Sequence, residues 1–183
     1  MKYFEHESAA TFDEAVSLLK ESPKGKTVVM AGGSDLIGVL KEQILEDYPE
    51  KVVDLKTVRG GEYIKQDGDT IEIGALTKLC DIVKSDLLNE KAPVLSQAAR
   101  SVATPLIRNV ATMGGNICQD VRCWFYRYPH GIGGRMDCMR KGGKECYAVM
   151  GDNRYHSIFG GMKVHTTPCS VQCPANTDIP AYM

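Results

Sequence analysis

The chain opens with a pattern of apolar and polar positions typical of an amphipathic helix. Thr11-Phe12-Asp13-Glu14 has the form of a capping box, in which the threonine side chain bonds forward and the glutamate reaches back. Apolar residues then recur at helical spacing until Pro23-Lys24-Gly25, which interrupts the pattern. We therefore predict a helix between these two signals.

Two short apolar stretches flank a second helical pattern. Residues 27–31 are short, apolar and β-branched and predict a buried strand, and residues 51–55 predict a second strand. The segment between them carries apolar residues at helical spacing from Leu36 to Ile44. Because a strand, a helix and a strand in this order usually place the strands side by side and parallel, residues 27–55 predict a β-α-β unit.

Further along, the pattern predicts a hairpin and then helices. Residues 63–66 and 70–73 flank Asp67-Gly68, which is a strong signal for a hairpin with a type I′ turn. Thr77 is placed to cap the next helix, and Pro93 suits the first turn of another.

The composition excludes several classes of protein. With 183 residues, 43% of them hydrophobic and 25% charged, the chain is typical of a globular protein with one generous domain or two small ones. A net charge of -1 provides no basic excess for binding nucleic acid. The apolar runs are too short to span a bilayer, and the N-terminal residues lack the apolar core of a signal peptide. We expect a cytoplasmic protein with neither a nucleic-acid nor a membrane partner.

The seven cysteines gather towards the end of the chain. Five of them fall in the last third: Cys123, Cys138, Cys146, Cys169 and Cys173. Without an export signal, thiolate ligation of a metal or cluster is a better interpretation of this group than a disulfide framework. Cys80 lies in a helical pattern and is expected to be a small buried hydrophobe.

Two glycine-containing turns are candidates for a phosphate site. Gly32-Gly33-Ser34-Asp35 lies between a predicted strand and helix, where backbone N–H groups can converge on an anion. The second turn is Thr112-Met113-Gly114-Gly115-Asn116, which likewise has paired glycines, with a hydroxyl and an amide beside them. The alternative for each is a tight turn that binds nothing. The first turn also lacks the G-x-G-x-x-G spacing of a dinucleotide fold.

Three ordered motifs resemble those of the FAD-binding domain of the molybdenum hydroxylases. This family includes xanthine dehydrogenase, the carbon monoxide dehydrogenase flavoprotein and 4-hydroxybenzoyl-CoA reductase. The motifs are A-G-G-S-D-L-I at 31–37, I-G-A-L-T at 73–77 and R-N-V-A-T-M-G-G-N-I at 108–117. The resemblance covers about residues 1–160. It implies an α+β fold, a two-subdomain FAD-binding domain of the molybdopterin dehydrogenase type, with an inserted cysteine-rich iron–sulfur loop.

The resemblance also implies a division of the chain and a set of cofactor contacts. Residues 1–58 would form an N-terminal β-α-β subdomain, and residues 59–160 a second α+β subdomain that includes the cysteine-rich loop 118–156. FAD would lie extended between the subdomains, so both glycine turns must face one cleft. The FAD-facing residues carried over from the family are Ala31, Gly32, Gly33, Ser34, Asp35, Leu36, Thr112, Gly115, Asn116, Cys118 and Asp120.

The reductase branch of that family carries an inserted loop in which four cysteines bind a [4Fe–4S] cluster near the flavin. Cys123, Cys138 and Cys146 align with three of them, and their spacing is too wide for the close pairs of a structural zinc site. Where the fourth would fall, the chain has Tyr155-His156. His156 is therefore the expected fourth ligand and Cys118 the alternative; otherwise the thiols are unligated.

Basic residues crowd the same region. They are Arg108, Arg122, Arg127, Arg135, Arg140, Lys141, Lys144 and Arg154. Such residues can stabilise an anionic cluster or the phosphates of FAD. The alternative is a solvated basic face, which we expect for most of them.

Residues 161–183 form a C-terminal tail with C-x₃-C-P. The tail resembles the start of the N-terminal iron–sulfur domain of the glutamate synthase small subunit, which needs further cysteines downstream. The chain could be a piece of a longer polypeptide, a neighbouring subunit could complete the site, or the tail could be a relic.

The function implied by these resemblances is electron transfer. We expect a flavoprotein subunit that passes electrons between FAD and a [4Fe–4S] cluster. Its partners in a hetero-oligomer would be a molybdopterin-containing large subunit, with molybdenum or tungsten, and a [2Fe–2S] small subunit. No residue has the pattern of a general acid, base or nucleophile, so substrate chemistry would take place on a partner. The alternatives are the flavin module of an NAD(P)H-oxidising iron–sulfur flavoprotein complex and a zinc-stabilised interaction module without flavin.

Overall fold

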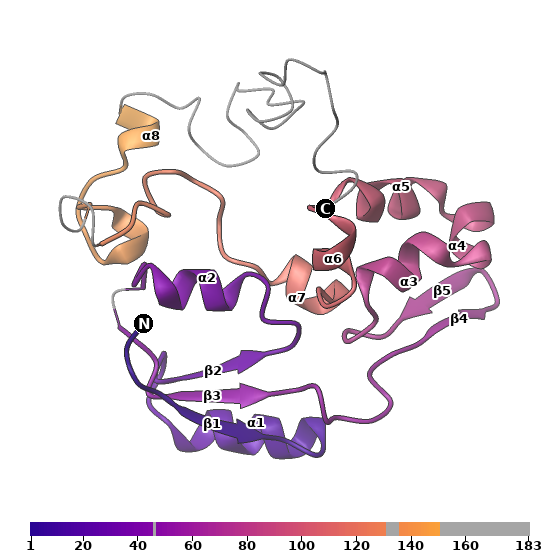
Figure 1. The fold of residues 1–183 in the computed structure, drawn as a ribbon, viewed down its shortest axis with the longest axis horizontal. Coiled ribbons are helices and arrows are strands. Elements are labelled where there is room, and N and C mark those ends of the chain that lie inside the picture. The colour runs from indigo at the N-terminus through magenta and orange to yellow at the C-terminus, as the bar shows by residue number, and fades with distance from the viewer. Residues whose placement is uncertain (46, 131–135, 151–183) are drawn as a thin grey trace.

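The computed structural model of the protein describes residues 1–45, 47–130 and 136–150 (Figure 1). His156 and the tail 161–183, with both of its cysteines, lie outside the described residues. Within the described ranges, no helix has the length and apolar character that crossing a bilayer requires.

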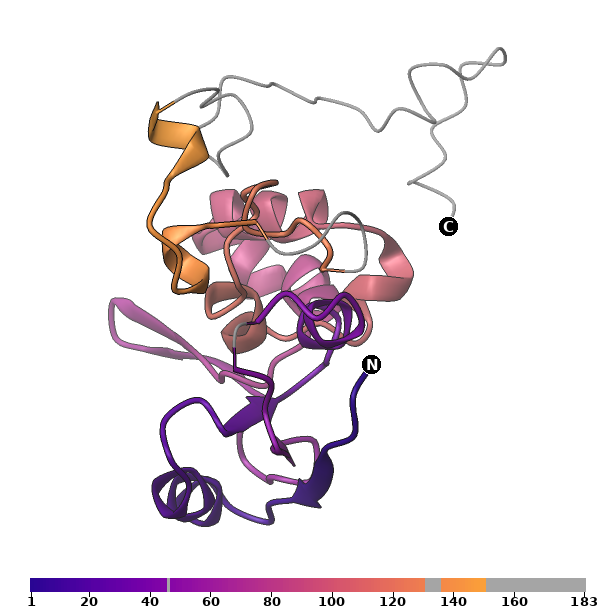
Figure 2. The same ribbon diagram turned by 90° about the vertical axis from the view of Figure 1, so that its left-hand side faces the viewer.

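A three-stranded parallel sheet forms the first lobe of the molecule (Figure 1). Its strand order is β1 (Glu5–Ser8), β3 (Lys51–Asp54), β2 (Thr27–Met30). The parallel pairing of β2 with β3 confirms the predicted β-α-β unit. Helices α1 (Phe12–Glu21) and α2 (Leu36–Lys41) lie on opposite faces of this sheet (Figures 1 and 2).

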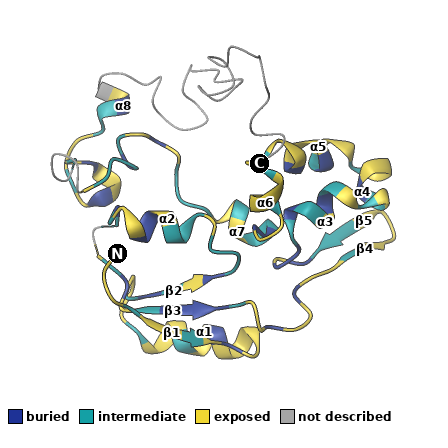
Figure 3. Cartoon of the chain, viewed as in Figure 1, coloured by how far each residue is buried: buried dark blue, intermediate teal, exposed yellow. Residues whose placement is uncertain are grey.

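The core of the first lobe surrounds β3, which is coloured as a buried strand in Figure 3. Val52 and Val53 are both fully buried, and because side chains alternate along a strand they point to opposite faces of the sheet. Val53 packs in one cluster with Ala15 of α1, and Val52 in another with Leu40 of α2. The sheet is therefore covered on both faces, as is usual for parallel strands.

The sequence does not predict β1, because Glu5-His6-Glu7-Ser8 shows no apolar alternation. In the structure β1 pairs in parallel with β3, and Lys51 Nζ of β3 donates to Glu7 Oε2 at 2.7 Å. Pairing with a neighbouring strand thus determines this element, where intrinsic preference gives no signal.

The capping box before α1 is confirmed in its forward half. Thr11 Oγ1 accepts the backbone N–H of Glu14 at 3.1 Å. The Glu14 carboxylate reaches back to the N–H of Ala10, at 2.7 Å, which is one residue earlier than the capping box predicts. Hydrogen bonds of the Thr11 and Glu14 side chains therefore stabilise the start of α1.

The second lobe combines a hairpin with short helices (Figure 1). Its antiparallel strands are β4 (Ile64–Asp67) and β5 (Thr70–Ile73). The helices are α3 (Leu79–Lys84), α4 (Asp86–Lys91), α5 (Pro93–Ser101), α6 (Pro105–Arg108) and α7 (Met113–Ile117). The buried residues of its core are Leu79, Ile82, Leu88, Ala99 and Ala111. Pro93 occupies the first turn of α5, as predicted.

The hairpin turn lies one residue later than predicted. Asp67 pairs with Thr70, so the loop is Gly68-Asp69 rather than Asp67-Gly68. Gly68 has φ +56°, whereas Asp69 is not among the residues with positive φ. The predicted type I′ turn is wrong, because that turn needs positive φ at both loop residues.

Two further predictions for this lobe are wrong. Thr77 does not cap α3, whose N-cap is Lys78. The Thr77 hydroxyl instead accepts the N–H of Tyr63 at 3.0 Å and donates to its carbonyl oxygen at 2.9 Å, so a contact with the hairpin replaces the cap. Cys80 is only partly buried, because the core-facing positions of α3 belong to Leu79 and Ile82.

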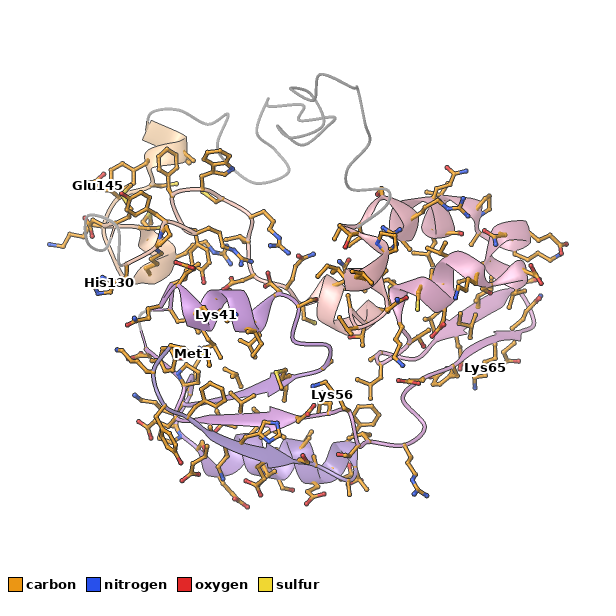
Figure 4. All side chains as sticks on the ribbon, in the orientation of Figure 1. Met1, Lys41, Lys56, Lys65, His130 and Glu145 are labelled. Carbon is orange, nitrogen blue, oxygen red and sulfur yellow. The ribbon has the colours of Figure 1, made fainter. Side chains whose placement is uncertain are left out.

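The described part of residues 118–150, which we call the cysteine segment, returns to the first lobe and contains η1 (Met139–Lys141) and α8 (Tyr147–Met150). Cys123, Tyr126 and Cys138 share a buried cluster with Val39 and Ile44. In Figure 4, His130 lies beside the end of α2, and the backbone N–H of His130 donates to the carbonyl oxygen of Glu42 at 3.3 Å. The described part of this segment therefore packs on α2.

Candidate functional site

A cleft of about 580 Å³ lies between the two lobes. Both glycine turns line it, which confirms the expectation that they face one cleft. The predicted FAD-facing residues on its wall are Ala31, Gly32, Gly33, Ser34, Asp35, Leu36, Thr112, Gly115, Cys118 and Asp120. Asn116 is not on this wall; its backbone N–H donates to the carbonyl oxygen of Thr112 at 2.8 Å.

The first glycine turn connects β2 to α2. Gly33 has φ +74°, in the left-handed region that glycine adopts without steric cost. Gly32 is required for a different reason, because a Cβ at this position would overlap the carbonyl oxygen of Val110. The turn therefore lies directly against the backbone of the second lobe.

The second glycine turn is the start of the short helix α7. Thr112 is its N-cap, and the Thr112 hydroxyl accepts the N–H of Gly115 at 3.2 Å. The N–H of Gly114 donates to the carbonyl oxygen of Ala75 at 2.8 Å, and the N–H of Met113 donates to that of Thr77 at the same distance. The motif at 73–77 thus supports the motif at 108–117.

Gly115 and Ala31 bring the two turns face to face. A Cβ built on Gly115 would lie 4.0 Å from the Cβ of Ala31. It would also lie 2.9 Å from the Thr112 hydroxyl, which is closer than a Cβ normally approaches another atom. The space beside Gly115 is therefore part of the cleft, and a larger side chain would fill it.

The Asp35 carboxylate holds the cysteine segment against the first turn. It accepts hydrogen bonds from Arg127 Nη2 at 2.9 and 3.1 Å and from the N–H of Asp120 at 3.0 Å. Arg122 Nη1 lies 3.1 Å from it. The side chains of Asp35 and Arg127 are only 16% and 18% exposed, so their ion pair is largely shielded from water.

Asp120 extends this network towards the cysteines. Its carboxylate accepts the N–H of Val121 at 3.1 Å and the hydroxyl of the buried Tyr126. Burial, and then the hydrogen bond to Asp120, raise the pKa of Tyr126 above its ordinary value of 10.0. The phenol therefore stays protonated at neutral pH and remains a donor to Asp120.

Replacing Asp35 with asparagine should lower the free energy of unfolding by about 1–3 kcal/mol, because two arginines lose their anionic partner in a shielded site. Urea unfolding near neutral pH measures the change. Glu50→Gln is the matched control, since Glu50 is 74% exposed in its pair with Lys26 and such a pair contributes about 0–1 kcal/mol. Equal losses in the two variants would contradict the role assigned to Asp35.

A known family accounts for the motifs and the cleft together. Residues 2–127 match the family described as the FAD binding domain in molybdopterin dehydrogenase. The match takes in more than half of the chain and contains both glycine turns. The chain belongs to this family.

Relatives of this FAD-binding domain are longer proteins. The nicotinate dehydrogenase FAD-subunit of Eubacterium barkeri is 34% identical over 117 residues, which are 64% of this chain and 39% of that protein. The aldehyde oxidoreductase FAD-binding subunit PaoB of Escherichia coli (strain K12) is 29% identical over 161 residues, 87% of this chain and 48% of that protein. A solved structure of carbon monoxide dehydrogenase from Hydrogenophaga pseudoflava matches with a TM-score of 0.60 and 31% identity, over 63% of this chain and 39% of that chain. The chain thus spans less than half the length of these relatives.

The first turn of this FAD-binding domain offers backbone donors to a ligand. The hydrogen bonds found among the described residues use none of the N–H groups of Gly32, Gly33 and Ser34. Neighbouring N–H groups in a turn are suited to binding phosphate oxygens. Together with Gly115, which lines the same cleft, they fit the pyrophosphate of a flavin dinucleotide.

The cysteines do not form a metal site in the part of the chain that the structure describes. Cys123 and Cys138 are each 7% exposed and share one apolar cluster, whereas Cys146 is partly buried and Cys118 is exposed. No group of three or more His, Cys, Asp or Glu side chains suited to a metal occurs among the described residues. The predicted ligand His156 lies outside them. The described residues therefore do not by themselves fit a [4Fe–4S] cluster, which requires a complete ligand set.

The sequence patterns do not identify several residues of the cleft wall. They are Phe12, Val28, Val29, Met30, Val39, Leu45, Leu55, Ala75, Leu76, Gly114 and Gln119, whereas Arg140 was expected only as one of a group of basic residues that can stabilise FAD phosphates. Ala75, Leu76 and Gly114 lie within the family motifs, so these motifs could have identified them as candidates for the cleft wall. The sequence instead predicts that Phe12 packs in the core, because it is an apolar residue in a helical stripe.

Proposed function

We propose that this chain binds FAD in the cleft between its lobes. In the proposal it is the flavin-carrying, electron-transfer part of a molybdenum- or tungsten-dependent hydroxylase or reductase complex. The observation that supports this most strongly is that two glycine turns, far apart in the sequence, line one cleft in a member of this domain family.

The chain's own residues would bind and orient the cofactor. The N–H groups of residues 32–34 would donate to the pyrophosphate, and Gly115 would leave room for it. Met30, Leu55 and Leu76 on the cleft wall would exclude water from the apolar parts of the ligand. Bound FAD supplies the redox chemistry, and the protein supplies binding, orientation and electrostatics.

The proposed partners are a molybdopterin-containing large subunit and a [2Fe–2S] small subunit, in a hetero-oligomer. The names of the relatives support a complex of several subunits, since they are the FAD-subunit of nicotinate dehydrogenase and the FAD-binding subunit of aldehyde oxidoreductase. Substrate chemistry would then take place on the large subunit.

A [4Fe–4S] cluster held by Cys123, Cys138, Cys146 and His156 remains part of the proposal. Two observations support this part. Cys123 and Cys138 are buried in one cluster, and the match to PaoB covers so much of the chain that it takes in residues 118–156. We derive no electron-transfer step through this cluster, because the described residues do not complete its ligand set.

Anaerobic purification of the chain tests both parts of the proposal. We expect a yellow-brown protein with bound FAD, iron and acid-labile sulfide. A protein that neither retains FAD nor binds it on addition would overturn the proposed function. Bound FAD without iron would remove the cluster alone. Co-purification of a large molybdopterin-containing subunit would test the proposed complex.

A further inference from the structure

Arg140 is the one cationic side chain on the cleft wall among the described residues. The other charged residues there are Asp35 and Asp120. A pyrophosphate entering the cleft would therefore meet two carboxylates, unless cations offset them. Arg122 and Arg127 already pair with Asp35, which leaves Arg140 as the cation that lines the cleft directly.

The backbone of Arg140 is held in place from both sides, on the preceding side by Met139, whose N–H donates to the carbonyl oxygen of Glu145 at 2.9 Å. Arg140 is the middle residue of η1, and its neighbour Lys141 is buried, with Nζ donating to the carbonyl oxygen of Tyr128 at 3.1 Å. The N–H of Lys141 donates to the carbonyl oxygen of the buried Cys138 at 2.8 Å. The cysteine segment thus fixes where the Arg140 guanidinium can reach.

The Arg140 guanidinium is available to a ligand. No ion pair or hydrogen bond of its side chain is found among the described residues, and the residue is exposed. Its element η1 lies beside Tyr126, since Nζ of the neighbouring Lys141 is 5.8 Å from the centroid of the Tyr126 ring. Because the Tyr126 hydroxyl donates to Asp120, Arg140 lies on the Asp120 side of the cleft.

We propose that Arg140, carried by the cysteine segment, binds the pyrophosphate of the flavin nucleotide across the cleft from the glycine turn at residues 32–34. This inference rests on the proposed function. A guanidinium suits this role because its planar N–H groups form charge-assisted hydrogen bonds with phosphate oxygens. The consequence is that the cysteine segment contributes directly to cofactor affinity.

The test is a titration of the deflavinated full chain with FAD, followed by flavin fluorescence, at several salt concentrations. Arg140→Gln should weaken FAD binding about tenfold and reduce its dependence on salt, because it removes a charge-assisted contact. Arg140→Lys keeps the charge and should lose less affinity for FAD than Arg140→Gln. Lys144→Gln is the matched control, since Lys144 is an exposed cation of the same segment that does not line the cleft.

The outcomes separate this inference from the proposed function. Wild-type affinity in Arg140→Gln, or an equal loss in Lys144→Gln, would overturn the role of Arg140 and leave FAD binding intact. A wild-type chain that does not bind FAD would overturn the proposed function itself. A loss confined to the Arg140 variants, larger for glutamine than for lysine, would support the inference.

Discussion

Replacing Gly115 with valine should lower the affinity for FAD about ten- to a hundredfold. The added side chain would occupy the space between the two glycine turns, where a Cβ would lie 4.0 Å from that of Ala31. Forcing extra atoms into a well-fitted site costs about 1–3 kcal/mol, and each 1.4 kcal/mol is about a factor of ten in affinity. Equilibrium titration of the deflavinated protein with FAD measures the loss.

Gly38→Val is the matched control for this experiment. Gly38 is also a helical glycine, in α2, and a Cβ there would meet no atom within 4 Å. The control should bind FAD like the wild type. Gly115→Ala should be intermediate, because its single extra carbon mainly approaches the Thr112 hydroxyl, at 2.9 Å. Full occupancy of FAD in Gly115→Val would count against the cleft as the cofactor site.

Gly32→Ala should destabilise the folded protein by about 2–3 kcal/mol, at the upper end of the usual cost of overpacking. The new methyl group would overlap the carbonyl oxygen of Val110. This neighbour is backbone, so it cannot move aside by changing a rotamer as a side chain could. Thermal and urea unfolding measure the effect.

Gly38→Ala again provides the comparison, now for stability. An alanine in an exposed helical position is more favourable than glycine by up to about 1 kcal/mol. The two glycine-to-alanine changes should therefore shift stability in opposite directions. A Gly32→Ala protein as stable as the wild type would show that the first turn does not need its close approach to Val110.

The elements predicted well from the sequence are those whose signal is local. The strand at residues 27–30 and its parallel partner at 51–54 each contain two adjacent valines, a residue type enriched in strands. β1 and the role of Thr77 were not predicted, because a neighbouring strand determines the first and a contact with Tyr63 the second. Neither partner can be identified from spacing along the chain.

The residues of the candidate site likewise divide into those that the sequence predicts and those that only the fold brings together. Its glycine turns could be found because a family motif marks them and because glycine has a conformational reason to occur there. Arg140 could not be singled out, since it is one of several basic residues and only the packing of the cysteine segment on α2 brings it to the cleft. Asp35 was expected to face the cofactor, and its pairing with Arg127 could not be predicted over so long a sequence separation.

The Asp35 network makes the cofactor site and the cysteine segment a thermodynamically linked pair. Asp35 belongs to the wall of the cleft, and its carboxylate pairs with Arg122 and Arg127 of the cysteine segment. Reciprocity follows for any such coupling in the proposed FAD complex: a ligand of the cysteine segment that changes the affinity for the nucleotide has its own affinity changed by the same free energy. In the proposed complex with FAD, a ligand that binds the cysteine segment should thus be detectable as a change in flavin dissociation.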